Sequence, residues 1–317
     1  MKILITGVGG NIGYFLTKFF ISKKIPVIGI DIIKNELLEE GQYYTFHSTD
    51  VVNSEAVNEV FSRVKPTHVI HLAFLMKPLH NLEREYLIDV TGSKNVIGAA
   101  VMTKSVKQFV QFSSTSAYGG RPDNKLWIKE TQPLSPGDYR YGKHKEEVEE
   151  YIAGLKKRKG LNFVVVRMCT CVGPSEYKKG GLVELIYKAP VLFNYGGRET
   201  EIQLLHERDL QEILYKIIRN TKMNGTFNLA PDDHCTVRDL VPDKKFLNLP
   251  LGPVKALFGL LWALRLTDIY PPAVQLSAYG IVADPAKLKK ALNYKFRFGT
   301  KAAFLDAVRG MKERQVL

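Results

Sequence analysis

The sequence predicts an α/β protein with a doubly wound parallel β-sheet and a smaller C-terminal lid. Three observations lead to this fold class. Short apolar runs typical of buried strands alternate with segments of helical periodicity as far as Arg167. A glycine-rich turn joins the first strand directly to the first helix. Beyond about Gly173 the alternation breaks and glycine pairs mark turns, which indicates a region of different architecture.

The composition is that of an ordinary globular protein rather than a disordered or membrane-embedded one. Of the 317 residues, 45% are hydrophobic and 24% are charged. The first predicted strand starts at Lys2, which leaves no room for a signal peptide, so we expect a cytoplasmic protein. The three cysteines form neither a disulfide framework nor a zinc motif, so no metal is expected. The net charge of +13 favours an anionic small-molecule substrate; without an aromatic-interleaved basic groove it does not indicate nucleic acid.

The first stretch of the chain has the layout of a Rossmann-type dinucleotide site. Lys2–Thr6 is a buried strand, a glycine turn follows, residues 14–20 continue at helical spacing, and an apolar run over 26–30 comes next. Glycines let the turn be tight and let the backbone approach a pyrophosphate, which the helix N-terminus also attracts. The expected cofactor contacts in this turn are Gly7, Gly10, Asn11, Ile12 and Gly13.

Asp31 ends the second strand, 18 residues after Gly13. A carboxylate there can accept hydrogen bonds from both ribose hydroxyls and would repel a 2′-phosphate. The sequence therefore favours NAD over NADP, although the nearby Lys34 weakens the preference.

The alternation continues along the chain and favours a parallel sheet with right-handed crossovers. The further elements expected are strands at 44–47, 67–73, 107–113 and 162–167 and helices at 54–64, 85–102 and 141–159. Asp50 and Val51 follow the third strand and would lie near the adenine, or Asp50 would cap the next helix before Ser54. Leu72 and Ala73 end the fourth strand at the cofactor rim, where His71 is expected to be a packed core histidine.

Hydroxyl side chains gather where the fifth strand ends, over residues 113–116. Ligands bind at this edge of an open α/β sheet, so Ser114 is placed to hold a substrate oxygen. The alternative is an ordinary Ser/Thr-rich turn.

Two overlapping Tyr-x-x-x-Lys pairs follow. Tyr141 and Lys145 share a helix face with the apolar Val148, whereas Tyr139 and Lys143 share one with glutamates. We therefore choose Tyr141 and Lys145. A neighbouring ammonium favours the phenolate of a tyrosine, whose free pKa is about 10. Tyr141 could then take a proton from a substrate hydroxyl while hydride leaves for NAD, and Lys145 would also hold the nicotinamide ribose.

These motifs together resemble the extended short-chain dehydrogenase/reductases, and within them the NAD-dependent epimerase/dehydratase family that acts on nucleotide sugars. The resemblance covers roughly residues 1–230. It rests on the glycine turn and Asp31, and on Asp50-Val51, His71-Leu72-Ala73, Ser113-Ser114 before Tyr118-Gly119, Tyr141-Gly142-x-x-Lys145 with Glu149, Arg167 with Val172-Gly173-Pro174, and His206-x-x-Asp209-Leu210.

The resemblance implies that Ser114, Tyr141 and Lys145 are catalytic and that the protein is a homodimer. Two departures concern Asp89, where many members have Asn, and Val172, where Tyr is frequent. A third concerns Thr115-Ser116, which stands where family dehydratases carry an Asp-Glu pair, so sugar dehydration is disfavoured.

The expected division is an NAD-binding Rossmann domain over 1–172 and a substrate-binding region over 173–317, interleaved with returning sheet elements at about 200–232. Arg198 and His206 are candidates to meet a diphosphate or a sugar; a surface or salt-bridge role is equally open for each. The apolar segment 254–266 is too short to span a bilayer, which takes about 20 residues. We expect a buried lid helix there, with a helix lying against a membrane or a lipophilic substrate as the lesser alternative.

Three functions follow from these expectations. The first is a nucleotide-sugar epimerase that uses NAD and a transient keto intermediate. The second is an NAD-dependent alcohol dehydrogenase or ketone reductase acting on a small or lipophilic substrate. The third, a non-catalytic nucleotide sensor, is disfavoured by the intact Ser114, Tyr141 and Lys145.

Overall fold

A seven-stranded sheet lies at the centre of the computed structural model, which describes residues 1–156, 158–315 and 317. The strand order is β11-β6-β5-β4-β1-β2-β3, so the order reverses beside β1, as in doubly wound folds. Strands β1 to β5 pair in parallel. The strands are β1 (Ile3–Thr6), β2 (Val27–Asp31), β3 (Tyr44–Ser48), β4 (His68–His71), β5 (Gln108–Ser114), β6 (Asn162–Met168) and β11 (Gly225–Leu229). The predicted fold class is confirmed.

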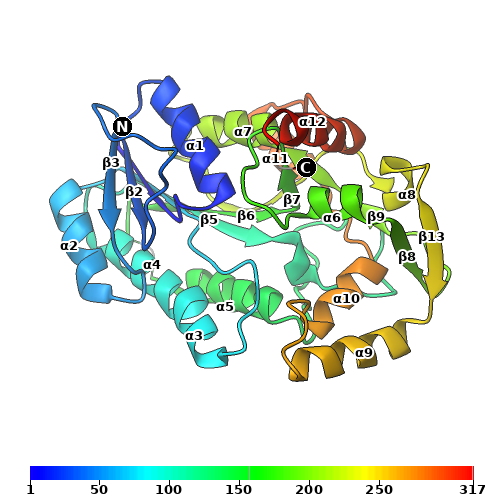
Figure 1. Ribbon diagram of the computed structural model, residues 1–317. Coiled ribbons are helices and arrows are strands. Elements are labelled where there is room, and N and C mark those ends of the chain that lie inside the picture. Colours follow the sequence, from blue (N-terminus) through cyan, green and yellow to red (C-terminus); the bar gives the residue numbers. More distant parts are fainter. Residues whose placement is uncertain (157, 316) are drawn as a thin grey trace. The chain divides into compact units, whose positions relative to one another are not determined.

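Helices cover both faces of this sheet, α1 and α7 on one and α2, α4 and α5 on the other (Figure 1). Because both faces are covered, β1 reads as a continuous apolar run whose Ile3, Leu4 and Ile5 are fully buried. The helical elements are α1 (Asn11–Ser22), α2 (Ser54–Val64), α3 (Leu82–Tyr86), the π-helical turn η1 (Leu87–Thr91), α4 (Gly92–Met102), α5 (Arg140–Gly154) and α7 (Glu207–Arg219).

The chain divides into two compact units. Unit 1 consists of Met1–Ser113, His144–Arg167 and Gln211–Phe227, and unit 2 of Ser114–Lys143, Met168–Leu210 and Asn228–Leu317. Unit 1 holds the core that α2, α4 and α5 form against the sheet. Unit 2 has its own core around Phe304 of α12. The predicted boundary between residues 172 and 173 stays a prediction.

Unit 2 contains short paired strands and helices. Within the described part of unit 2, three two-stranded sheets form, β10 with β7, β12 with β9 and β13 with β8. The elements are the 3-10 turn η2 (Thr115–Tyr118), β7 (Thr170–Val172), α6 (Leu182–Lys188), β8 (Val191–Tyr195), β9 (Glu201–Ile202), β10 (Leu204–His206), β12 (Cys235–Thr236), α8 (Val237–Leu240), β13 (Lys245–Leu249), α9 (Leu251–Ala263), α10 (Pro271–Ala278), α11 (Ala286–Leu292) and α12 (Thr300–Glu313).

The structure differs from the sequence predictions at three helices. The helix expected over 85–102 is interrupted by the π-helical turn η1. The helix expected over 141–159 ends at Gly154, and Lys157 lies outside the described residues. The prediction of a buried helix at 254–266 is wrong, because α9 forms there without a single buried residue. Among the described residues, no helix has the length and apolar character needed to cross a bilayer.

Candidate functional site

The glycine turn is packed so closely that side chains would not fit. Gly7 has φ +78°, and a β-carbon on it would lie 2.8 Å from the Ala73 nitrogen. A β-carbon on Gly13 would lie 2.3 Å from the Gly7 carbonyl oxygen. Helix α1 begins after Gly10, with no side-chain cap and no acidic residue in its first turn. Its first N–H groups have no partners within the helix, which is the arrangement that binds phosphate.

Asp31 closes this cradle from the end of β2. Its Oδ2 accepts a hydrogen bond from the Gly9 nitrogen at 2.9 Å, and its Oδ1 accepts one from Ile33 at 3.2 Å. The carboxylate is therefore fixed against the glycine turn, where a ribose would lie. Lys34, the cation that weakened the preference for NAD, forms an ion pair with Glu40 at 2.9 Å. These residues fit an unphosphorylated dinucleotide.

The other predicted cofactor contacts lie at the ends of neighbouring strands. Leu72 and Ala73 follow β4 and donate their N–H groups to Thr6 Oγ1, each at 3.2 Å. Val51 is buried, and Asp50 pairs with Arg84 at 3.1 Å.

Helix α2 is capped by a residue other than Asp50. Asn53 is the N-cap, and its side chain accepts a hydrogen bond from the Ala56 nitrogen. The alternative role of Asp50 as a helix cap is therefore wrong.

His71 is a packed core residue, as predicted. Its Nδ1 lies 2.7 Å from Thr6 Oγ1, and its Nε2 lies 2.9 Å from Ser93 Oγ. Burial lowers the pKa of His71 to about 3, so the ring is neutral. This network joins β1, β4 and α4 directly beneath the glycine turn.

Lys145 is buried on α5, where it is 3% exposed. Its Nζ donates to the Phe112 carbonyl at 2.8 Å and lies 3.3 Å from the centre of the Phe74 ring. Burial lowers the pKa of Lys145 to about 7, although the Asp89 and Glu149 carboxylates oppose this shift. The ammonium is thus costly to maintain, and these two carboxylates favour it.

Glu149 fixes α5 one turn further along. Its carboxylate receives the Ser113 hydroxyl from β5. It also accepts hydrogen bonds from Arg167 of β6, with Nη2 at 2.8 Å and Nε at 3.1 Å. The helix that carries Lys145 is therefore tied to two adjacent strands by one buried charge.

Tyr141 lies one helical turn before Lys145 in α5 and is half-buried. The expected helix phase is the one observed, because Lys145 and Val148 are buried whereas Lys143 is exposed. Ser114 ends β5, and its Oγ accepts hydrogen bonds from the nitrogen and the hydroxyl of Ser116, at 3.1 and 2.8 Å.

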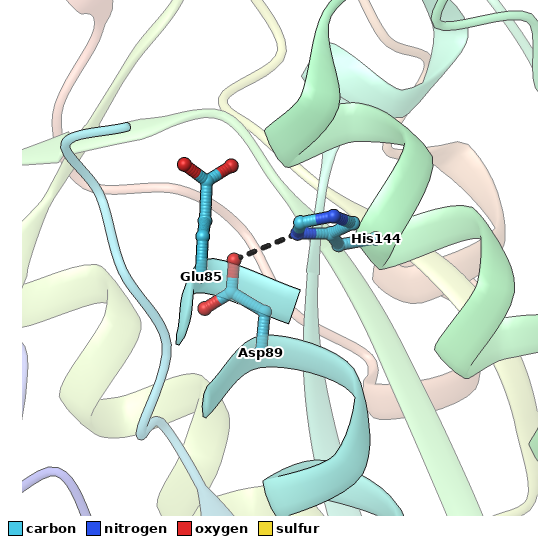
Figure 2. A group of neighbouring side chains, drawn as sticks. All are labelled: Glu85, Asp89 and His144. Atoms are coloured by element: carbon cyan, nitrogen blue, oxygen red, sulfur yellow. Dashed lines mark hydrogen bonds and ion pairs between the residues drawn. The ribbon is translucent and has the colours of Figure 1, made fainter. Parts of the chain in front are cut away.

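Sequence reasoning missed a buried polar cluster beside Lys145, which consists of Glu85, Asp89 and His144 (Figure 2). His144 Nδ1 lies 3.0 Å from Asp89 Oδ2. Asp89 also accepts the Leu75 N–H at 2.8 Å, and Glu85 accepts the Leu79 N–H at 2.6 Å. The cluster therefore holds the loop after β4 against α5. The sequence signal that pointed to this cluster was Asp89 itself, which stands where many members of the resembling family have Asn.

The ligand atoms of these three side chains lie within 4.8 Å of one another, as those around a metal ion would. Each of the three side chains is engaged by the hydrogen bonds just described, and these bonds suffice to explain the arrangement. Burial raises the pKa of Asp89, whereas His144 and the Leu75 N–H lower it.

The two predicted substrate contacts, both in unit 2, have different surroundings. Arg198 is exposed, 5.8 Å from the centre of the Tyr279 ring. His206 is fully buried, with Nε2 3.0 Å from Asp306 and Nδ1 accepting the Arg208 N–H at 3.0 Å. Its ring also stacks on Phe298. For His206 these contacts favour the salt-bridge role over contact with a substrate.

Known proteins resemble this chain in sequence along most of its length. The sequence model of the NAD dependent epimerase/dehydratase family matches residues 3–230. A GDP-6-deoxy-D-talose 4-dehydrogenase of Aggregatibacter actinomycetemcomitans is 25% identical over 313 residues, which cover 96% of each chain. A UDP-glucuronate 4-epimerase of Thermodesulfobacterium geofontis is 27% identical over 187 residues, 54% of this chain and 56% of the relative.

Solved structures share the fold. The Bordetella bronchiseptica enzyme WbmG, in complex with NAD and UDP, has a TM-score of 0.80 at 20% identity, over 100% of this chain and 96% of its own. UDP-glucose 4-epimerase of Thermotoga maritima, with UDP-glucose, has a TM-score of 0.76 at 20% identity, over 99% of this chain and 100% of its own. The family match spans the glycine turn, Asp31, β5 and α5, and the chain therefore belongs to the NAD-dependent epimerase/dehydratase family, as an enzyme whose cofactor is NAD.

Proposed function

We propose that the protein is an epimerase of a nucleotide sugar that works through a transient keto intermediate, with Ser114, Tyr141 and Lys145 as its catalytic residues. The observation that carries the proposal is the buried amine of Lys145 on α5, one helical turn after Tyr141. Burying a lysine costs free energy, and ionisable groups with strongly perturbed pKa values cluster at functional sites.

The chain's own residues would divide the chemistry as follows. The Lys145 ammonium favours the phenolate of Tyr141, which takes the proton of a sugar hydroxyl. Ser114 donates a hydrogen bond to the oxygen that becomes a carbonyl. NAD, held by the glycine turn and Asp31, would supply a reversible hydride acceptor for the carbon that bears this oxygen. Tyr141 then gives the proton back after the sugar has presented its other face.

The substrate class rests on charge and on the neighbouring proteins. The net charge of +13 favours an anionic ligand such as a nucleotide diphosphate. Solved neighbours contain UDP or UDP-glucose. Arg198 is our candidate for the diphosphate. Thr115 and Ser116 offer no carboxyl group as a proton donor for elimination, which disfavours a dehydratase.

A net dehydrogenase is the second candidate. The relative that shares 96% of its length with this chain is named a 4-dehydrogenase, whereas the epimerase relative shares 56%. The same three residues would serve, without return of the hydride.

Cofactor turnover distinguishes the two functions. The purified protein is incubated with UDP- and GDP-sugars, while NADH absorbance and sugar stereochemistry by NMR are followed. An epimerase interconverts two sugars without net NADH, and a dehydrogenase forms NADH in proportion to product. If no nucleotide sugar is converted or raises the melting temperature, the nucleotide-sugar proposal fails.

Tyr141→Phe tests the assignment of the base. We expect the variant to bind NAD normally and to lose about 10²- to 10⁴-fold in kcat, as when a general base is removed. Tyr139→Phe is the matched control and should keep its activity. Full activity in Tyr141→Phe together with a loss in Tyr139→Phe would move the base to residue 139.

A further inference from the structure

Four neighbouring loops of unit 1 form one surface at the amino edge of the central sheet. They precede β4, β5, β6 and β11, which are adjacent in the strand order. The Lys107 N–H donates to the Thr67 carbonyl at 2.8 Å, and the Asn162 N–H donates to the Lys107 carbonyl at 3.0 Å. The Asn162 side chain also donates to the Thr221 carbonyl at 2.7 Å. The strands therefore begin side by side. The loops cover residues 65–67, 103–107, 155–156 with 158–161, and 220–224.

Every charged side chain in these four loops is basic. Within the residues that the structure describes, their exposed lysines form no ion pair, whereas Lys34 elsewhere in unit 1 pairs with Glu40. The nearest acidic residues along the chain are Glu59 and Glu150, each at least one helical turn before the end of its helix. The cationic edge is defined here as the six exposed lysines of these loops, Lys65, Lys104, Lys107, Lys156, Lys159 and Lys222.

Arg158 fixes the shape of this edge without leaving its own charge available. Its Nη2 donates to the Val106 carbonyl at 2.6 Å and to the Thr103 carbonyl at 3.2 Å. Its Nε donates to the Val101 carbonyl at 3.1 Å. The loop before β6 is thereby tied to the loop before β5. The charges that remain for a partner are lysine ammonium groups, which act as point charges rather than as planar forks.

The dipoles of the helices explain only part of this pattern. Lys65 is the C-cap of α2, and Lys104 and Lys156 follow the ends of α4 and α5. A cation there offsets the partial negative charge of the helix end, and the effect falls off within one turn. Lys107 and Lys159 lie beyond that turn, closer to the strands that follow. A structural role therefore does not account for the whole cationic edge.

We propose that the cationic edge docks on an anionic lipid bilayer. Its lysines follow α4 and α5 on one face of the sheet and α7 on the other, so the charge is spread over an area rather than along a groove (Figure 1). A plane of anionic headgroups has negative charge with the same spread and attracts each basic residue near it. Met102, two residues before Lys104, is 80% exposed and adds an apolar side chain that can enter the headgroup layer.

Nucleic acid is the less suitable partner, although its phosphates carry the same charge. Proteins that bind single strands stack the bases on aromatic side chains, and the four loops contain no aromatic residue. Arginine makes the commonest specific contact with a base in the major groove, and the one arginine of these loops is engaged by backbone carbonyls. The arrangement of the charges therefore favours the bilayer.

Docking through this edge leaves the cofactor cradle open. Strands β1 and β4 are parallel, and the glycine turn follows the carboxyl end of β1. Within unit 1 the turn therefore lies at the opposite ends of the strands, facing away from the bilayer. We expect the same NAD affinity with and without vesicles. The docking does not depend on which reaction the protein catalyses.

Vesicle flotation of the purified protein tests the proposal. Vesicles of phosphatidylcholine mixed with phosphatidylglycerol should carry the protein upward in a density gradient, and vesicles of phosphatidylcholine alone should not. Added salt should release the protein, because the interaction between exposed charges is screened. A fluorescently labelled RNA duplex, titrated at the same salt concentration, should bind more weakly per phosphate than the anionic vesicles.

Paired substitutions locate the surface. Lys104→Gln together with Lys107→Gln should lower the affinity for anionic vesicles by about fivefold per lysine. Lys104→Arg together with Lys107→Arg should keep the affinity, because a bilayer responds to the charge. Lys290→Gln together with Lys295→Gln is the matched control, since it removes the same charge from two exposed lysines of unit 2. Melting temperatures show whether each variant is folded.

Four results would overturn the proposal. The first is a protein that stays unbound to anionic vesicles at low salt. The second is an equal loss of affinity in the Lys104→Gln, Lys107→Gln variant and in its control. The third is competition between NAD and vesicles, which would place the contact at the cofactor cradle. The fourth is tighter binding of the RNA duplex that also depends on Lys104 and Lys107, which would make nucleic acid the partner.

Discussion

Lys145 shows at the residue scale how one side chain meets opposed demands. Burial of its amine disfavours a charge, although the Phe112 carbonyl and the face of the Phe74 ring are both favourable partners for a cation. The carboxylates of Asp89 and Glu149 favour the charge. The proposed chemistry needs the ammonium, so the protein would accept a loss of stability at this position for the sake of function.

Replacing Lys145 should therefore stabilise the cofactor-free protein. Burial lowers the pKa of Lys145 from 10.5 to about 7, so the folded state is penalised most below about pH 7, and the penalty disappears as pH rises through 10.5. We expect Lys145→Met to raise the free energy of unfolding by about 1–3 kcal/mol near neutral pH. Urea unfolding of both proteins near pH 7 and near pH 10 measures the difference. A variant that is less stable than the parent at both pH values would contradict this account.

Asp89 should affect the pH dependence of the reaction through Lys145. Its carboxylate raises the pKa of Lys145, so Asp89→Asn lowers that pKa and removes ammonium at a given pH. We expect the alkaline limb of the kcat profile to move to lower pH. The variant has the residue that many family members carry, and its amide oxygen can still accept the Leu75 N–H. A profile that keeps its position while overall activity falls would indicate a purely structural role.

At the scale of single residues, helical periodicity and motif spacing predicted which side chains share a buried face. The helix phase placed Lys145 on the buried face of α5, and the structure agrees. His144 was not predicted as part of the site, because it lies at the border of that face and a single histidine forms no recognisable motif. Its partner Asp89 is 55 residues away, and only the folded chain brings the two together.

At the element scale, the glycine turn depends on close contact between segments. The turn touches the end of β4 and the start of α1, and α1 begins without a side-chain cap. The spacing of the glycines predicted this turn, because the requirement is local. The π-helical turn η1 was not predicted, since such turns are rare and occur as single turns within otherwise continuous helices.

Gly13→Ala should remove NAD binding and destabilise the fold. Its β-carbon would lie 2.3 Å from the Gly7 carbonyl oxygen, so backbone must move, at a cost of about 1–3 kcal/mol. Gly98→Ala is the control, because it lies within α4 with no atom within 4 Å of the added carbon. That change should stabilise the protein by about 0.5–1 kcal/mol. Calorimetry and NAD titration measure both effects, and an equal response of the two variants would refute the packing argument.

The segment 254–266 was assigned correctly as a helix and wrongly as a buried one. Its apolar composition predicts burial, yet α9 contacts α10 on one side only and exposes its leucines. Composition tells that a segment avoids water. It does not tell whether the covering partner belongs to the same chain.

At the scale of the whole molecule, the central sheet contains ionisable groups that acid would charge. His68 and His71 are both on β4, and burial lowers their pKa values to about 4 and about 3. Both folded pKa values lie below the ordinary value of 6.5, so stability is full above about pH 6.5 and is lost as the pH falls toward them.

We expect the free energy of unfolding to fall by up to about 1.4 kcal/mol per pH unit for each of these histidines. His71→Asn should be less stable at neutral pH and should show a shallower loss between about pH 6 and pH 4. Urea unfolding at several pH values compares the two slopes. Parallel curves for the parent and the variant would show that His71 is not the source.

The sheet itself was the most predictable part of the protein. Its strands on both sides of β1 are short runs with turn residues at their ends, and their alternation with helices predicts parallel pairing with right-handed crossovers. Unit 2 was less predictable, because its two-stranded sheets pair segments such as β8 and β13 that are about 50 residues apart. Pairings of that kind depend on tertiary contacts and leave no periodic signature.

The ion pair between Lys34 and Glu40 has a consequence for redesign of cofactor choice. Removing the Asp31 carboxylate alone would relieve the repulsion of a phosphorylated ribose but would supply no positive charge to receive it. Glu40 holds Lys34 at 2.9 Å and also accepts the Phe46 N–H, so that cation is already in use. An NADP-dependent form would therefore require replacement of both Asp31 and Glu40, because Lys34 becomes available to a phosphate only when its ion pair with Glu40 is removed.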